Sequence, residues 1–122
     1  MKKSKEARQY RKMHRKHQKE LIRLAIETRE WDFGWLHDMI IMQIKHMYEY
    51  YSAGNHVYQS EETLNKVLES LKHTLDLQYE LDTLWDKERD DLTSYEDLNK
   101  RESELYAEIY TYIGQNIQWW WD

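Results

Sequence analysis

The chain has 122 residues and a formal net charge of −5, a size typical of one domain. It contains no Cys, which excludes disulfides, thiolate metal sites and a Cys nucleophile. No apolar run approaches the roughly 20 residues needed to span a bilayer. The basic start lacks the apolar stretch of a secretory signal. We therefore expect a protein of the cytoplasm that makes no membrane contact.

The composition predicts an all-α fold. The chain has three Gly and no Pro, β-branched residues are scattered, and no stretch alternates with period two. We expect a small bundle of three to four helices forming a single domain over residues 1–122. Its parts would be a basic N-terminal arm over residues 1–29, a helical core over residues 30–114 and a Trp-rich tail over residues 115–122.

Charge is segregated along the chain. Residues 1–29 hold eleven Lys/Arg and three Glu, hence +8, and residues 30–122 carry −13. A first helix is predicted over Lys5–Thr28, because residues three and four apart share one helix face. In the N-terminal half of this stripe, histidines replace aliphatic residues. The stripe consists of Tyr10, His14, His17, Leu21, Leu24 and Thr28.

A second helix is predicted from Phe33 to about Ala53, with Asp32 as its N-cap and Gly54 just after its end. Two neighbouring apolar stripes leave only a narrow polar strip, so both sides should be buried. We expect a central helix, a subunit interface with Met39 and Met42, or both, and hence a homo-oligomer. The stripes are Leu36, Ile40, Ile44, Met47 and Tyr51, and Trp35, Met39, Met42, His46 and Tyr50; the polar strip is Asp38, Lys45, Glu49 and Ser52.

Two further helices are predicted in the C-terminal half. Ser60 is a good N-cap for a third helix, which the charged run Asp86–Asp91 should end. The pair at the ends of Thr93–Glu96 has the form of a capping box, favouring a fourth helix over Ser94–Ile113 that stops at Gly114. The alternative is one continuous helix over residues 61–113.

The C-terminal tail carries Trp119, Trp120 and Trp121 in succession. Neighbouring side chains diverge on a helix or a strand, so at least one indole should be exposed in a monomer. We expect either a tail folded back on its own core or an intersubunit anchor. A docking peptide or a stacking wall for a base are further functional readings.

The basic arm is a candidate phosphate-binding surface. Its cations would bind nucleic acid without sequence preference and with salt-sensitive affinity. Alternatively, the arm lies on the acidic surface of its own or a neighbouring subunit. The candidate residues are Arg8, Arg11, Lys12, Arg15 and Lys16.

The stretch Gly54–Ser60 is a candidate ligand loop. Its polar side chains precede a helix N-terminus, where backbone N–H groups favour an anion such as phosphate. Aromatic residues nearby in sequence could complete a pocket; an ordinary capped turn is the alternative. The candidate residues are Trp31, Trp35, Tyr50, Tyr51, Asn55, His56, Tyr58 and Gln59.

Neither a metal site nor a catalytic centre is predicted. The residues Glu69, His73, Asp76 and Glu80 share one helix face, but the chain has no Glu-x-x-His pair of the kind that helical carboxylate sites use. The pair His14 and His17 is an equally weak ligand set. Phosphate loops, nucleophile elbows and zinc-protease motifs are absent from the sequence. We expect a non-enzymatic protein without cofactors.

Part of the chain resembles a group of small uncharacterised proteins of tailed phages. The segment Ile44–Met47, then Tyr50-Tyr51, Gly54 and the stretch Val57–Glu61 before a Leu-rich helix, resemble their Leu-Lys-x-Met helix, Gly turn and amphipathic helix. Many of those proteins also end in Trp-Trp-Asp, as residues 120–122 do here. The resemblance implies a phage protein acting in the bacterial cytoplasm, and it implies no particular activity.

These observations favour a binding protein that antagonises host defence. The first expectation is an oligomeric helical protein that sequesters a nucleotide-like immune signal, because aromatic residues accompany basic and polar groups. The alternatives are inhibition of a host defence protein and a nucleic-acid-associated role for the basic arm.

Overall fold

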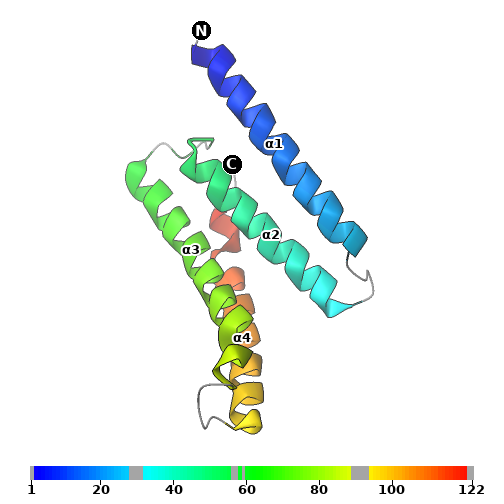
Figure 1. Ribbon diagram of the computed structural model, residues 1–122. Helices are drawn as coiled ribbons and strands as arrows, with labels where there is room; N and C mark the ends of the chain where they lie inside the picture. The colour runs from blue at the N-terminus through cyan, green and yellow to red at the C-terminus, as the bar shows by residue number, and fades with distance from the viewer. Residues whose placement is uncertain (1, 28–31, 56–57, 59, 89–93, 121–122) are drawn as a thin grey trace. The chain divides into compact units, whose positions relative to one another are not determined.

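The chain is all-α (Figure 1). The computed structural model describes residues 2–27, 32–55, 58, 60–88 and 94–120, and within these ranges it contains no strand. The side chains of residues 2–4, 87 and 88 are also left out of the description. The helices are α1 (Lys2–Glu27), α2 (Phe33–Ser52), α3 (Glu61–Thr83) and α4 (Tyr95–Asn116), with two 3₁₀ segments, η1 (Leu84–Glu88) and η2 (Ile117–Trp119).

Two compact units make up the chain, each built on a pair of antiparallel helices (Figure 1). The basic hairpin, residues 1–57, contains α1 and α2; its twelve Lys/Arg and seven Asp/Glu give +5. The acidic hairpin, residues 58–122, contains the remaining elements; its six Lys/Arg and sixteen Asp/Glu give −10. The charge contrast therefore follows the division between the units. The expectation of a single domain over residues 1–122 stays a prediction.

The predicted helix ends at Asp32, Gly54 and Ser60 are confirmed. The Asp32 carboxylate accepts a hydrogen bond from the Gly34 backbone N–H at 3.0 Å, and the Ser60 hydroxyl oxygen accepts one from the Thr63 N–H at 3.4 Å. Each satisfies a donor that a helix leaves unpaired at its first turn. Gly54 has φ +93°, the left-handed conformation that ends a helix and favours glycine.

The break between the third and fourth helices is also confirmed, but its predicted cap is off by one residue. The N-cap of α4 is Ser94, whose backbone is extended and whose Oγ accepts from the Asp97 N–H at 3.2 Å. Ser94 therefore caps the helix in the place that we expected Thr93 to take. The helix begins at Tyr95, and Thr93 lies outside the described residues.

The prediction that Gly114 stops the last helix is wrong. Helix α4 continues to Asn116, and the chain then tightens into η2 up to Trp119. Gly114 has no positive φ, and a Cβ placed on it would meet nothing within 4 Å. A glycine inside a helix costs only about 1 kcal/mol relative to Ala. The side chain of Asn116 supports the extra turn by donating to the Tyr112 carbonyl at 2.9 Å.

The acidic hairpin has an aliphatic core to which the C-terminal tail returns. Trp120 is only 6% exposed, and its Nε1–H donates to the Ser70 Oγ at 2.7 Å. Trp119 points outward and is 59% exposed, while Trp121 lies outside the described residues. The tail thus folds back at Trp120, as one of our two readings expected. The buried aliphatic residues are Val67, Leu71, Leu81, Leu84, Leu98, Leu105, Ile109 and Ile113.

Helix α2 carries buried residues from both of its predicted stripes. Ile44 and Tyr51 belong to the first stripe and His46 to the second, whereas buried His37 belongs to neither. Leu36, at the start of the first stripe, is 57% exposed. Apart from Leu36, the residues of both stripes are half-buried or buried, and the fully buried ones lie in the C-terminal half of the helix.

Candidate functional site

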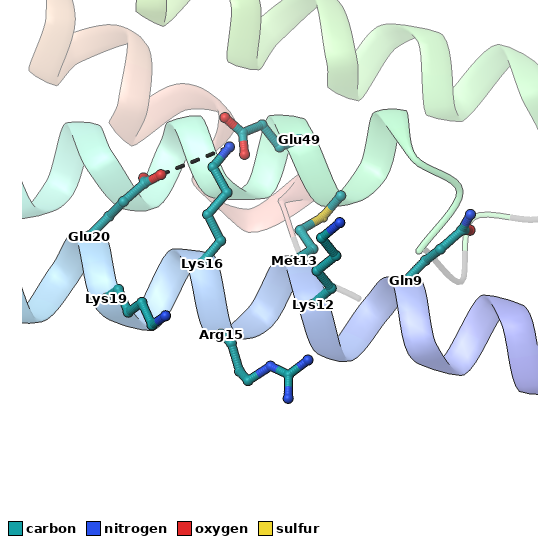
Figure 2. A pocket seen from close by; sticks show the side chains of 8 residues that line it. All are labelled: Gln9, Lys12, Met13, Arg15, Lys16, Lys19, Glu20 and Glu49. Atoms are coloured by element: carbon teal, nitrogen blue, oxygen red, sulfur yellow. Dashed lines mark ion pairs between the residues drawn. The ribbon is translucent and has the colours of Figure 1, made fainter.

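An open groove of about 840 Å³ runs along the basic hairpin (Figure 2). Helix α1 supplies nearly all of its lining, and α2 supplies one carboxylate. Four of the eight lining residues are cationic and two are anionic. The lining residues are Gln9, Lys12, Met13, Arg15, Lys16, Lys19, Glu20 and Glu49.

The cations of this groove belong to a row along α1. Arg8, Lys12, Arg15 and Lys19 follow one another at i, i+4, i+7 and i+11, so they share one helix face over about 16 Å. All four side chains are exposed, and Arg15 extends away from α2 (Figure 2). Arg11 and Lys16 are exposed beside the row. The five residues predicted to bind phosphate therefore lie together on one exposed side of α1.

The four cations of the row form no ion pair with a described residue. Within α1, the Lys16 Nζ lies 3.9 Å from the Glu20 Oε1, and the Arg23 Nε lies 2.9 Å from the Glu27 Oε1. For Arg8, Arg11, Lys12, Arg15 and Lys19, no carboxylate of a described residue lies within 4.0 Å. These cations are therefore available to an external anion.

Two histidines bind the two carboxylates that line the groove. The His17 Nε2 of α1 lies 2.6 Å from the Glu49 Oε2 of α2, and the His46 Nε2 of α2 lies 2.8 Å from the Glu20 Oε2 of α1. Each helix thus contributes one His-x-x-Glu pair, and the two pairs cross between antiparallel helices. We call these four residues the His–Glu cluster.

The two imidazoles of the His–Glu cluster are buried against each other. Their ring centroids lie 3.8 Å apart with the planes 9° from parallel, and both side chains are almost fully buried. The His17 Nδ1 has no hydrogen-bond partner among the described residues. A proton on that atom would therefore leave a buried N–H unpaired, whereas a proton on Nε2 can be donated to Glu49.

A tyrosine extends this polar layer toward the N-terminus of α1. Tyr50 places its ring edge-on to His17 at 4.5 Å, and its hydroxyl lies 3.1 Å from the His14 Nδ1. Burial raises the pKa of Tyr50. The histidines in the predicted stripe of α1 therefore form polar contacts with α2 where an aliphatic seam would otherwise lie.

The electrostatics of the cluster keep Glu20 charged and favour a neutral His46. The hydrogen bond from His46 lowers the pKa of Glu20, an effect that outweighs desolvation. Burial lowers the pKa of His46, even though Glu20 acts in the opposite direction. One wall of the groove is therefore anionic at neutral pH, while the outer face of α1 is cationic.

The aromatic candidates of the predicted ligand loop do not lie together along α2. Trp35 and Tyr50 stand fifteen residues apart in α2, about 22 Å along its axis. Tyr50 contacts α1, Tyr51 is buried, and the Asn55 backbone N–H donates to the Tyr50 carbonyl at 3.0 Å. Tyr58 belongs to the acidic hairpin, where its hydroxyl donates to the Trp119 carbonyl at 2.7 Å. Trp31, His56 and Gln59 lie outside the described residues.

The remaining candidates are the predicted interface residues of α2 and the polar face of α3. Met39 and Met42 are half-buried in α2, and their role in a subunit interface stays a prediction. On α3, His73 packs its ring on Tyr112 at 4.4 Å. The Glu80 Oε2 accepts from the Arg101 Nε at 2.7 Å, which raises the pKa of Arg101. Among the described residues, no three His, Asp or Glu side chains are placed to hold a metal ion.

Comparison of the chain with models of known protein families, with curated protein sequences and with solved structures finds no match. In the part of the chain that the structure describes, no helix is both long and apolar enough to cross a membrane.

Sequence reasoning missed the His–Glu cluster, although a signal was present. His17 and Glu20 repeat the spacing of His46 and Glu49, and each pair lies on one face of its helix. Glu49 belongs to the predicted polar strip of α2, yet it is half-buried and accepts a hydrogen bond from α1. Two equal His-x-x-Glu pairs on adjacent antiparallel helices would have indicated this pairing.

Proposed function

We propose that the chain is a non-enzymatic nucleic-acid-binding protein that contacts the phosphate backbone with the basic face of α1. The observation that carries this proposal is the row of exposed cations without ion pairs beside an open groove. Cations of this kind bind phosphates, and the released counterions supply the affinity.

The linear arrangement supports a polymeric anion over a single nucleotide. The cations of the groove all come from one helix and follow its axis, so they match a chain of phosphates. A nucleotide pocket needs polar groups that converge from several elements and, for base recognition, an aromatic surface. The groove lining contains one Met and no aromatic residue.

The carboxylates of the groove indicate which side of α1 meets the phosphates. Glu20 and Glu49 line the side next to α2 and repel a phosphate there. Arg15 extends to the opposite side (Figure 2). Backbone contacts should therefore involve the outer face of α1 with Lys12, Arg15 and Lys19, and they should show little base preference.

Sequestration of a nucleotide-like immune signal, inhibition of a host defence protein, an origin in a phage and a homo-oligomeric state all stay predictions. The basic groove, with its linear row of cations and no aromatic lining residue, favours nucleic-acid binding over the first two.

The proposal is tested by measuring how salt affects binding of a fluorescent DNA duplex. Four phosphate contacts predict a slope of about −3.6 for log K against log salt concentration. In the Lys12→Gln/Arg15→Gln/Lys19→Gln variant, the slope should become shallower by about 2.7. Fluorescence anisotropy over a series of KCl concentrations measures both slopes.

The matched control removes three cations elsewhere. The Lys45→Gln/Lys72→Gln/Lys100→Gln variant has the same net charge, and all three of its positions are exposed. Its slope should equal that of the original chain. If both variants weaken binding equally, net charge alone governs it and the α1 face is not the site.

A further inference from the structure

A second cavity, of about 380 Å³, lies within the acidic hairpin. It is formed where the first turns of α3 approach the end of α4 and η2, and it is separate from the basic groove. A volume of this size is within the range that small-molecule sites occupy. Its lining residues are Thr63, Lys66, Val67, Ser70, Asn116 and Trp119.

The aromatic wall of this cavity is held in place by its neighbours. Trp119 is 59% exposed, and its carbonyl accepts the Tyr58 hydroxyl at 2.7 Å. The next residue, Trp120, is anchored by its indole N–H on Ser70 at 2.7 Å and by its backbone N–H on the Ile117 carbonyl at 3.0 Å. The tail is therefore held at the carbonyl of Trp119 and at the residue after it, and Trp119 lines the cavity.

The polar groups of the cavity divide into those already used and those still available. The Ser70 hydroxyl both donates to the Val67 carbonyl and accepts from Trp120, so its hydrogen bonding is occupied. The Asn116 amide nitrogen donates to the Tyr112 carbonyl, which leaves its oxygen as an acceptor. The Lys66 Nζ contacts only the exposed Glu62, at 3.4 Å, among the described carboxylates.

We propose that this cavity binds a planar aromatic ring that carries an anionic group, of the nucleoside monophosphate class. The ring stacks on Trp119, Val67 lies beneath it, and the anion meets the Lys66 ammonium. Indole stacking tolerates any base because every base has a π-face, so the site selects for a ring and a charge together. The Asn116 oxygen offers an acceptor to an exocyclic amine or a ribose hydroxyl.

The inference does not depend on nucleic-acid binding by α1. Phosphate recognition by the row of cations involves only residues of the basic hairpin, whereas this cavity involves only residues of the acidic hairpin. The Lys12→Gln/Arg15→Gln/Lys19→Gln variant should therefore bind a mononucleotide as the original chain does.

The test follows the indole N–H signals of the full chain by NMR during titration with adenosine monophosphate, adenosine or inorganic phosphate. The monophosphate should shift the Trp119 signal in a saturable way, and phosphate alone should not. Trp119→Ala should weaken monophosphate binding at least about tenfold. Lys66→Ala should weaken binding of the monophosphate severalfold and leave that of adenosine unchanged.

Two control variants match these changes on the same helix. Tyr79 is 70% exposed and lies outside the cavity, and Lys72 is paired with Asp76 much as Lys66 is with Glu62. Tyr79→Ala and Lys72→Ala should bind as the original chain does, and all four variants should keep its far-UV circular dichroism. No saturable shift with the monophosphate, or equal affinity in Trp119→Ala and Tyr79→Ala, would overturn the proposal.

Discussion

Ser70 shows how one hydroxyl can fix the position of the whole C-terminal tail. Its Oγ is the acceptor for the buried Trp120 indole N–H at 2.7 Å. Ser70→Ala removes that acceptor and leaves the N–H buried and unpaired, which costs about 1–3 kcal/mol. We expect the free energy of unfolding of the acidic hairpin to fall by this amount, measured by urea denaturation followed by Trp fluorescence.

A second serine provides the control for this change. Ser103 is exposed on α4, so Ser103→Ala should alter the free energy of unfolding by less than about 0.5 kcal/mol. Because Trp119 is held by the same tail, Ser70→Ala should also weaken ligand binding in the neighbouring cavity. A stability equal to that of Ser103→Ala would show that the Trp120 hydrogen bond contributes nothing net.

The pairing of α1 with α2 should depend on pH through the His–Glu cluster. The folded-state pKa of His46 lies below 6.5, so the unfolded chain takes up a proton first as pH falls. The stability that neutral His46 contributes is therefore fully present above pH 6.5 and is lost as pH falls through the folded-state pKa. The folded-state pKa of Glu20 lies below 4.5, so its contribution is present above that value and lost as pH falls through its own folded-state pKa. Both groups thus act in the same direction. We expect the free energy of unfolding of the basic hairpin to decrease steadily from pH 7 to pH 4.

A histidine substitution separates the two contributions. In His46→Gln, the amide can still donate to Glu20 but cannot titrate, so the loss of stability just below pH 6.5 should disappear while the loss near pH 4 remains. The measurement is urea unfolding at several pH values, followed by NMR signals of residues 33–52. His73→Gln, at an exposed position of α3, should retain the full pH dependence. An unchanged profile in His46→Gln would exclude His46 as the titrating group.

The sequence predicts the interactions between residues close together in the chain, but not those between residues far apart in it. The caps at Asp32 and Ser60 join residues two and three apart, so the residue types alone indicate them. The bonds of His17 to Glu49 and of His46 to Glu20 join residues 32 and 26 apart, and they depend on the register of two helices. Hydrophobic periodicity places these histidines on the correct face but does not identify their partners.

The candidate sites differ in the same way. The cationic face of α1 follows from helical spacing, because each side chain contributes without a partner. The cavity beside Trp119 forms because the end of α4 and η2 packs near the start of α3. The prediction that the helix stops at Gly114 gave no reason to expect this packing. The aromatic pocket around Gly54 relied on proximity in sequence, yet a continuous α2 keeps Trp35 and Tyr50 apart.

The division of charge between the two units should influence nucleic-acid binding by the whole molecule. The basic hairpin carries +5 and the acidic hairpin −10, so the acidic hairpin should repel a polyanion bound at α1 as proposed. This repulsion acts over the Debye length, which is about 30 Å at 0.01 M salt and about 8 Å at 0.15 M. The acidic hairpin should therefore weaken binding mainly at low ionic strength.

Neutralising three carboxylates on α3 tests this effect. Glu69→Gln/Asp76→Asn/Asp82→Asn changes exposed positions and should raise the affinity for duplex DNA severalfold at 0.01 M salt, yet leave it nearly unchanged at 0.15 M, because screening removes the repulsion. Anisotropy titrations at the two salt concentrations measure the difference. Glu69→Asp/Asp76→Glu/Asp82→Glu keeps every charge and should match the original chain at both. An equal gain at both concentrations would mean that these carboxylates act through direct contact with the DNA and not through the long-range field of the acidic hairpin.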